Sequence, residues 1–89
     1  MYTQQELDAI DREYFAVIIA DQYDVTLMSK NTHHVWQLHN VEMPDGEVTV
    51  VFHKHKASHP YHLHGRTNTL RQAVRGIRRH DKCQMNGRR

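Results

Sequence analysis

The sequence predicts an α+β fold in the order α-β-β-β-α, with a three-stranded antiparallel sheet and both helices packed on one face of it. Amphipathic helix patterns lie near the two ends of the chain, and three short β-forming stretches joined by turn signals lie between them. The 89 residues suffice for one small domain, which we place at residues 1–81. Residues 82–89 are polar and basic, and we expect them to form a flexible tail.

The first helix is predicted from a capping box and an apolar stripe. Thr3 and Glu6 have the spacing at which each side chain bonds the other residue's backbone N–H at the start of a helix. The apolar stripe that follows consists of Leu7, Ile10, Tyr14, Val17 and Ile18. This spacing predicts a helix of about four turns that fades near residues 23–24.

The three strands are predicted at residues 24–30, 33–41 and 47–55. In the second strand, alternation directs His34, Trp36 and Leu38 to one face and His33 to the other. The sequence Met43-Pro44-Asp45-Gly46 marks a hairpin between the second and third strands, because Asp-Gly suits a positive φ angle.

The third strand carries two histidines that we expect on an exposed sheet face. Its predicted core residues are Val48, Val50 and Phe52, and the residues predicted on the other face are Thr49, Val51, His53 and His55. Residues 56–65, which contain Pro60, are predicted to form a loop. His62 and His64 in this loop would lie on the approach to the last helix.

The last helix is predicted to be amphipathic and basic. Thr67 is its expected N-cap, and its apolar face consists of Leu70, Ala73, Val74 and Ile77. Arg71, Arg75, Arg78 and Arg79 fall on the opposite face. This arginine stripe has a spacing that could follow a phosphate backbone.

Charge is distributed unequally along the chain, although the formal net charge is only +2. Residues 1–43 contain two basic and seven acidic side chains, whereas residues 44–89 contain ten basic and three acidic ones. This asymmetry predicts a polyanionic partner, RNA or DNA. The predicted nucleic-acid contacts are His53, Lys54, His55, Lys56, His62, His64, Arg66, Arg71, Arg75, Arg78 and Arg79.

Other functional classes are disfavoured by what the sequence contains. Cys83 is the single cysteine, so an intramolecular disulfide and a cysteine-based zinc site are excluded, and a reducing cytoplasm is the expected compartment. The acidic N-terminal stretch is unlike a signal peptide, and the apolar run at residues 15–20 is too short to span a membrane. We expect no cofactor and no membrane partner; the oligomeric state is open.

Two short motifs resemble those of the HicA (YcfA-like) mRNA interferase toxins. The first is Asn31-Thr32-His33-His34 before a strand, where the family has glycine in place of Asn31. The second is His64-Gly65 followed by Thr69-Leu70-Arg71 in the last helix. The resemblance implies a double-stranded-RNA-binding-domain-like fold, an antitoxin partner, and a catalytic histidine at His33 or His34 that would take a proton from a ribose 2′-OH. We favour His33, because alternation places it on the open face.

Three alternatives to RNA cleavage remain open. The chain could bind RNA or DNA without cleaving it, as an accessory protein of a mobile element does. His53, His55, His62 and His64 could bind Zn²⁺, although the lysines and arginines around them disfavour a cation, and our prediction contains no metal site. The domain could also be purely structural and pair an exposed strand edge with a partner.

Overall fold

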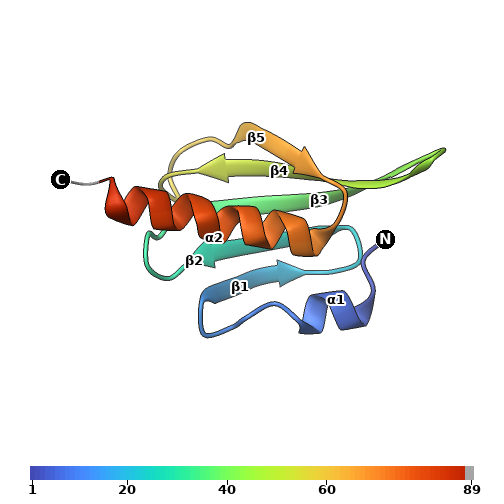
Figure 1. Ribbon diagram of the computed structural model, residues 1–89, viewed down its shortest axis with the longest axis horizontal. Coiled ribbons are helices and arrows are strands. Elements are labelled where there is room, and N and C mark those ends of the chain that lie inside the picture. The colour runs from blue at the N-terminus through green and yellow to red at the C-terminus, as the bar shows by residue number, and fades with distance from the viewer. Residues whose placement is uncertain (88–89) are drawn as a thin grey trace.

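The computed structural model describes residues 1–87 and shows a five-stranded antiparallel sheet with two helices. The elements are α1 (Gln4–Asp8), β1 (Phe15–Ala20), β2 (Asp24–Ser29), β3 (Val35–Met43), β4 (Gly46–Lys54), β5 (His62–Thr67) and α2 (Leu70–Asn86). The strands lie in the sheet in sequence order, and α2 crosses one face of it (Figure 1). The fold is α+β, but the prediction of a three-stranded sheet is wrong.

The first additional strand, β1, lies within the predicted first helix. The capping box forms as predicted, with Thr3 Oγ1 accepting from the Glu6 N–H at 3.1 Å, but α1 ends at Asp8. The Asp11 carboxylate then accepts from the Glu13 N–H at 2.9 Å, a turn that competes with helical hydrogen bonds. The run that follows, Phe15–Ala20, is rich in β-branched side chains, which favour a strand.

The second additional strand, β5, occupies part of the predicted loop. It pairs with β4 and forms an edge of the sheet, and most of its residues are exposed. A half-buried strand is recognised by alternating apolar and polar residues, and an exposed edge strand lacks this alternation. The sequence pattern therefore did not predict β5. As a result, Thr67 lies in β5, and Thr69 is the N-cap of α2, accepting from the Gln72 N–H at 3.1 Å.

The hydrophobic core lies between α2 and the sheet. Its members are Tyr2, Leu7, Ile10, Phe15, Val25, Leu27, Trp36, Leu38, Val51, Leu70, Ala73 and Ile77. Each large apolar side chain buried here contributes roughly 1.5–3 kcal/mol to stability. Leu7 of α1 and Leu70 of α2 belong to the same core, so both helices contribute apolar residues to this side of the sheet.

The faces of β4 are the reverse of the prediction. Thr49, Val51 and His53 are buried beneath α2, whereas Val50 and Phe52 lie half-buried on the open face. Valines occur on both faces of this strand, so alternation does not determine which face is covered. The register decides it, because β4 pairs His53 with Trp36 and Val51 with Leu38, both of which are buried.

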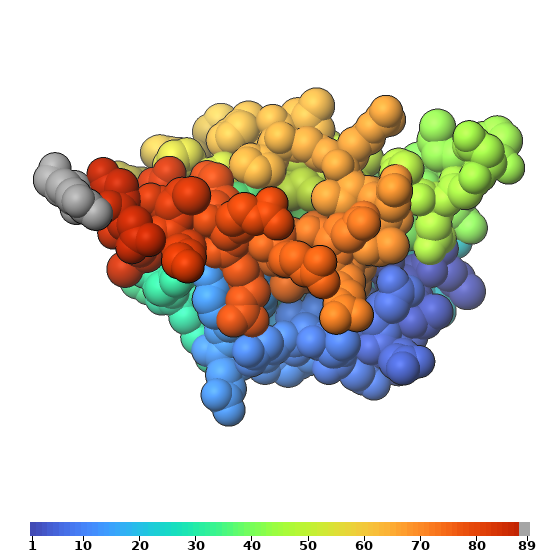
Figure 2. Space-filling model, in the orientation of Figure 1, coloured from blue at the N-terminus to red at the C-terminus, as the bar shows by residue number. Residues whose placement is uncertain are grey.

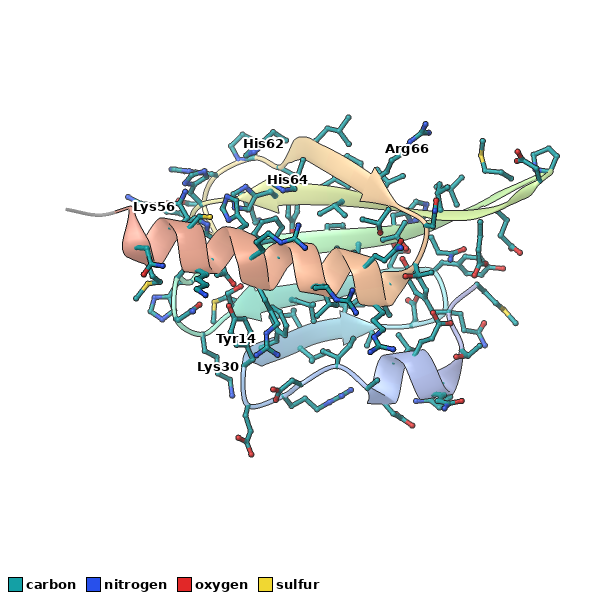
Figure 3. The ribbon with its side chains drawn as sticks, viewed as in Figure 1. Tyr14, Lys30, Lys56, His62, His64 and Arg66 are labelled. Atoms are coloured by element: carbon teal, nitrogen blue, oxygen red, sulfur yellow. The ribbon has the colours of Figure 1, made fainter. Side chains whose placement is uncertain are left out.

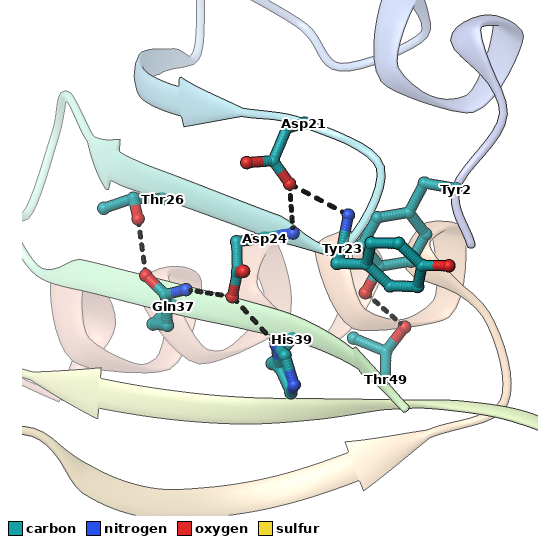
Figure 4. A network of polar contacts seen from close by, with 8 residues as sticks. All are labelled: Tyr2, Asp21, Tyr23, Asp24, Thr26, Gln37, His39 and Thr49. Carbon is teal, nitrogen blue, oxygen red and sulfur yellow. Dashed lines mark hydrogen bonds and ion pairs between the residues drawn. The ribbon is translucent and has the colours of Figure 1, made fainter. Parts of the chain in front are cut away.

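The open face of the sheet carries a polar network (Figure 4). The Thr26 hydroxyl donates to Gln37 Oε1, and Gln37 Nε2 donates to Asp24 Oδ1 at 2.9 Å. Asp24 Oδ1 also lies 2.8 Å from Nδ1 of His39. Such side-chain contacts satisfy polar groups on the face that α2 leaves uncovered.

The last helix is longer than predicted. It runs to Asn86, so residues 82–86 of the predicted tail are helical, and residues 88–89 lie outside the described part of the chain. Within residues 1–87, neither helix combines the length and apolar character that a membrane span requires.

Candidate functional site

Six of the histidines gather at one end of the layer between α2 and the sheet. They are His34, His53, His55, His62, His64 and His80, and we call them the histidine cluster. Figure 3 shows His62 and His64 on β5, with His64 between that strand and α2. The neighbouring rings have centroids between 4.6 and 6.2 Å apart, so the rings are in contact or nearly so.

Three members of the cluster, His34, His53 and His80, form an inner trio. One ring nitrogen from each lies within 4.8 Å of the others. His34 and His53 are buried, with 3% and 2% of their surface exposed, and His80 is half-buried. Nε2 of His53 and Nδ1 of His34 share a hydrogen bond of 3.0 Å.

Three different elements position the trio. His34 lies just before β3, and the β3–β4 register places His53 opposite Trp36. The indole and the His53 imidazole are stacked, with centroids 4.0 Å apart and an interplanar angle of 20°. His80 lies one helical turn after Ile77 on the buried side of α2, so the helix brings the third imidazole to the sheet.

The outer three members surround the trio and are exposed. His55 follows β4, and its ring lies 4.6 Å from His34 and 4.8 Å from His53. In β5, the register against β4 shifts between Phe52 and Val51, which is a bulge at His64. His62 and His64 therefore both approach the trio, with rings 5.1 and 5.5 Å from His53.

Burial favours the uncharged form of His53 and His80. The pKa of His53 is lowered to about 3. Desolvation by burial is the largest cause, and repulsion from the charged forms of His80, His34, His55 and His62 adds to it. Desolvation is also the main cause that lowers the pKa of His64 and of His80. A neutral imidazole keeps a lone pair on one nitrogen, and this is the form that ligates metals.

One ring nitrogen in the cluster is buried without a hydrogen bond. Among residues 1–87, Nδ1 of His80 has no hydrogen-bond partner, nor has Nε1 of the adjacent Trp36. A buried polar atom without a partner carries a desolvation cost of about 1–3 kcal/mol. The His80 nitrogen can recover that cost by coordinating a cation, whereas the indole N–H can only donate.

Asp81, next to His80, connects α2 to the turn that carries His34. Its buried carboxylate accepts from the Tyr14 hydroxyl at 2.7 Å and from the Thr32 hydroxyl at 3.0 Å. The Thr32 oxygen in turn accepts from the His34 N–H at 3.2 Å. This chain of hydrogen bonds fixes His34 and His80 relative to each other.

A second feature, the outer side of α2, is strongly basic. Residues of α2 cover much of the face shown in Figure 2, and Arg75 and Arg79 line two open hollows of about 490 and 500 Å³ beside the helix. Arg78 is engaged, because its guanidinium lies 4.4 Å from the Tyr14 ring centroid and 3.6 Å from Asp11.

The structure separates residues that the sequence grouped together. His33 is exposed in the turn before β3, with a φ angle of 64°, whereas its neighbour His34 is buried in the cluster. The prediction that His53 is exposed is wrong, because α2 covers it, and a buried side chain is a poor contact for phosphate. Lys54 points to Tyr61, with Nζ 4.3 Å from the ring centroid.

The remaining predicted contacts lie on the surface. Exposed side chains among them are His55, Lys56, His62, His64, Arg66, Arg71, Arg75, Arg78 and Arg79. His80 and Asp81 were not among the site residues predicted from sequence. A signal was present, because both continue the apolar stripe of Leu70 and Ile77 with helical spacing.

No protein-family model matches the chain, and no similar chain was found among curated proteins or solved structures. The resemblance to the HicA toxins, and RNA cleavage at His33 or His34, stay predictions.

Proposed function

We propose that this protein binds one divalent transition-metal ion through the inner trio of His34, His53 and His80. The observation that carries the proposal is the convergence of three imidazole nitrogens, from two strand regions and a helix, within 4.8 Å of one another. Tetrahedral ligands at the zinc–nitrogen distance of about 2.0–2.1 Å lie about 3.3 Å apart, so modest side-chain rotation brings the trio to that geometry.

The donor set indicates the class of metal. Imidazole suits Zn²⁺, Cu²⁺, Ni²⁺ and Fe²⁺, whereas Mg²⁺ and Ca²⁺ require oxygen ligands. Asp81, the carboxylate next to the trio in sequence, already accepts hydrogen bonds on both oxygens. Three histidines leave the fourth position of a tetrahedral ion to water or to another ligand, an arrangement typical of reactive or exchangeable sites.

The direct test is metal titration of matched variants. Calorimetry with Zn²⁺, and the visible absorption of tetrahedral Co²⁺, are recorded for the wild type and for His80→Ala, with circular dichroism as a check on folding. We expect one site per chain and an affinity loss above about a hundredfold, because even indirect ligand partners are worth 10–100-fold.

The matched control removes two histidines that lie outside the cluster, His39 and His59, each replaced by alanine. This variant should keep the wild-type affinity and the Co²⁺ spectrum. If it loses affinity as much as His80→Ala does, the binding comes from scattered surface imidazoles and the proposal is wrong.

A second candidate function is nucleic-acid binding by the basic side of α2, and the exposed arginines there favour it. Removing Arg75 and Arg79 should weaken binding to duplex DNA. The slope of log affinity against log salt concentration should fall in magnitude by about 0.9 for each lost phosphate contact. Arg12→Ala is the control, because Arg12 donates to backbone carbonyls of Leu7 and Ile10 instead. Equal affinities would argue against this candidate.

Both candidates are compatible with a cytoplasmic protein, which is the compartment we propose. A single cysteine is consistent with reducing conditions.

A further inference from the structure

The outer members of the histidine cluster are more exposed to solvent than the inner trio. His55, His62 and His64 are exposed, whereas His34 and His53 are buried. An exposed ring lies beside each buried or half-buried one: the His55 ring is 4.6 Å from His34, and the His64 ring is 5.4 Å from His80. The exposed imidazoles thus lie next to the two buried members of the trio and to the half-buried His80.

The outer rings contact different pairs within the trio. His55 lies beside His34 and His53, with centroid distances of 4.6 and 4.8 Å. His64 lies beside His53 and His80, at 5.5 and 5.4 Å. An ion held by either outer ring is therefore already next to two inner ligands.

The third outer ring extends this set toward solvent. His62 lies 5.1 Å from His53 and 6.2 Å from His55, measured between ring centroids. The cation of Lys54, which would repel a metal, is turned to Tyr61 and to the carbonyl of Ala57, with an Nζ–O distance of 3.1 Å.

We propose that His55, His62 and His64 form an entry path that passes a hydrated divalent transition-metal ion to the inner trio and back. The ion moves by ligand exchange: an outer imidazole replaces a water, an inner imidazole replaces a second water, and the outer bond is released once the trio is complete. No bond within a side chain breaks and no electron is transferred. The inference rests on the proposed metal function and assigns the outer rings a kinetic role.

The test separates rates from affinity. A variant with His55, His62 and His64 all changed to glutamine is compared with the wild type and with a control in which His39 and His59 are changed to glutamine. Zinc chloride is the probe: stopped-flow mixing gives the association rate, and transfer to an excess of chelator gives the release rate. His55→Gln alone, which lies outside every strand, serves as a second variant if the triple change disturbs β5.

We expect the outer variant to bind and release Zn²⁺ about tenfold more slowly, which corresponds to about 1.4 kcal/mol in each barrier. Its Kd should stay within a small factor of the wild-type value, and the control should match the wild type in both rates. Unchanged rates in the outer variant would overturn the entry path while leaving the proposed function intact.

Two further outcomes would also overturn the entry path. A large loss of affinity in the outer variant would show that an outer histidine is a permanent ligand. Absence of Zn²⁺ binding to the wild type would remove both the proposed function and the inference that rests on it.

Discussion

The two ends of the layer beneath α2 are built from opposite chemistry. Toward the start of the helix, Leu70, Ala73 and Ile77 pack in an apolar core with Leu38 and Val51. Toward its end, the ring of His80 lies beside the buried ring of His53, and the buried carboxylate of Asp81 accepts from Tyr14 and Thr32. Burial of the aliphatic end stabilises the fold, whereas burial of imidazoles removes their water and disfavours their charged form, which is the main reason for the low pKa of His53. Burial therefore stabilises the fold at the aliphatic end, whereas at the histidine end it carries a desolvation cost.

The largest effect should come from the aliphatic end. Leu38 is fully buried and pairs with Val51 across β3 and β4. Leu38→Ala should lower the free energy of unfolding by about 2–5 kcal/mol, because it removes buried methyl groups and leaves a cavity. Urea denaturation of the metal-free protein measures this loss. Leu63→Ala, at a side chain that is 66% exposed, is the control and should change stability by less than about 0.5 kcal/mol.

The next effect is the loss of stability at high pH from Tyr2, at the aliphatic end. Burial raises the pKa of Tyr2 to about 12, although its hydrogen bond with the Thr49 hydroxyl, 2.7 Å long, opposes the rise. Since the folded protein favours the protonated phenol, the contribution is complete below pH 10 and is lost as the pH rises through about 12.

We expect this loss to be about 2 kcal/mol, less than the full conversion of the shift because screening reduces it. Urea denaturation between neutral pH and pH 12 measures it, and Tyr2→Phe should flatten the decline. An equally steep decline in Tyr2→Phe would contradict the assignment.

A smaller effect is expected where α2 is tied to the turn before β3. Asp81→Ala leaves the hydroxyls of Tyr14 and Thr32 without their acceptor, which should cost about 1.5 kcal/mol. The variant should also weaken metal binding, because His34 and His80 are no longer held together. Thr32→Ala combined with Asp81→Ala in a double-mutant cycle measures the coupling; additive losses would show that the hydrogen bond between them is unimportant.

The smallest effect should come from making the histidine end apolar. Replacing His34 and His53 together by leucine should change the stability of the metal-free protein by less than about 1 kcal/mol, because the donor and the acceptor of the hydrogen bond that joins the two rings are removed together. The same variant should bind no metal at the trio. A loss of stability as large as that of Leu38→Ala would show that these histidines are structural, and the contrast between the two ends would fail.

Part of this fold could be predicted from sequence, and the failures have local causes. The β3–β4 hairpin forms where Pro44 and Asp45 indicated it, with Gly46 at a φ angle of 140°, and the apolar stripe of α2 is buried as expected. The first helix failed because Leu7, Ile10 and Tyr14 happen to recur at helical spacing across a turn. The spacing of apolar residues alone does not reveal the turn in which the Asp11 carboxylate accepts from a backbone N–H.

The candidate site was predictable only in fragments. The density of histidines at residues 53–64 was evident, but the face on which His53 lies depends on strand register, which alternation does not fix when both faces contain valine. His80 is distant in sequence from the other members and joins them only through helix packing. Tertiary contacts of this kind bring the trio together, so sequence spacing could not identify it.

Trp36 gives the molecule a built-in optical reporter. It is the single tryptophan, its ring is stacked on His53, and it meets the rings of His64 and His80 edge-on at 5.1 Å. Its fluorescence therefore senses the cluster directly: a paramagnetic ion such as Cu²⁺ bound there should quench the emission, and a closed-shell ion such as Zn²⁺ should shift it. Occupancy of the cluster can be followed in the unlabelled protein, at the position where the aliphatic and histidine halves of the interior meet.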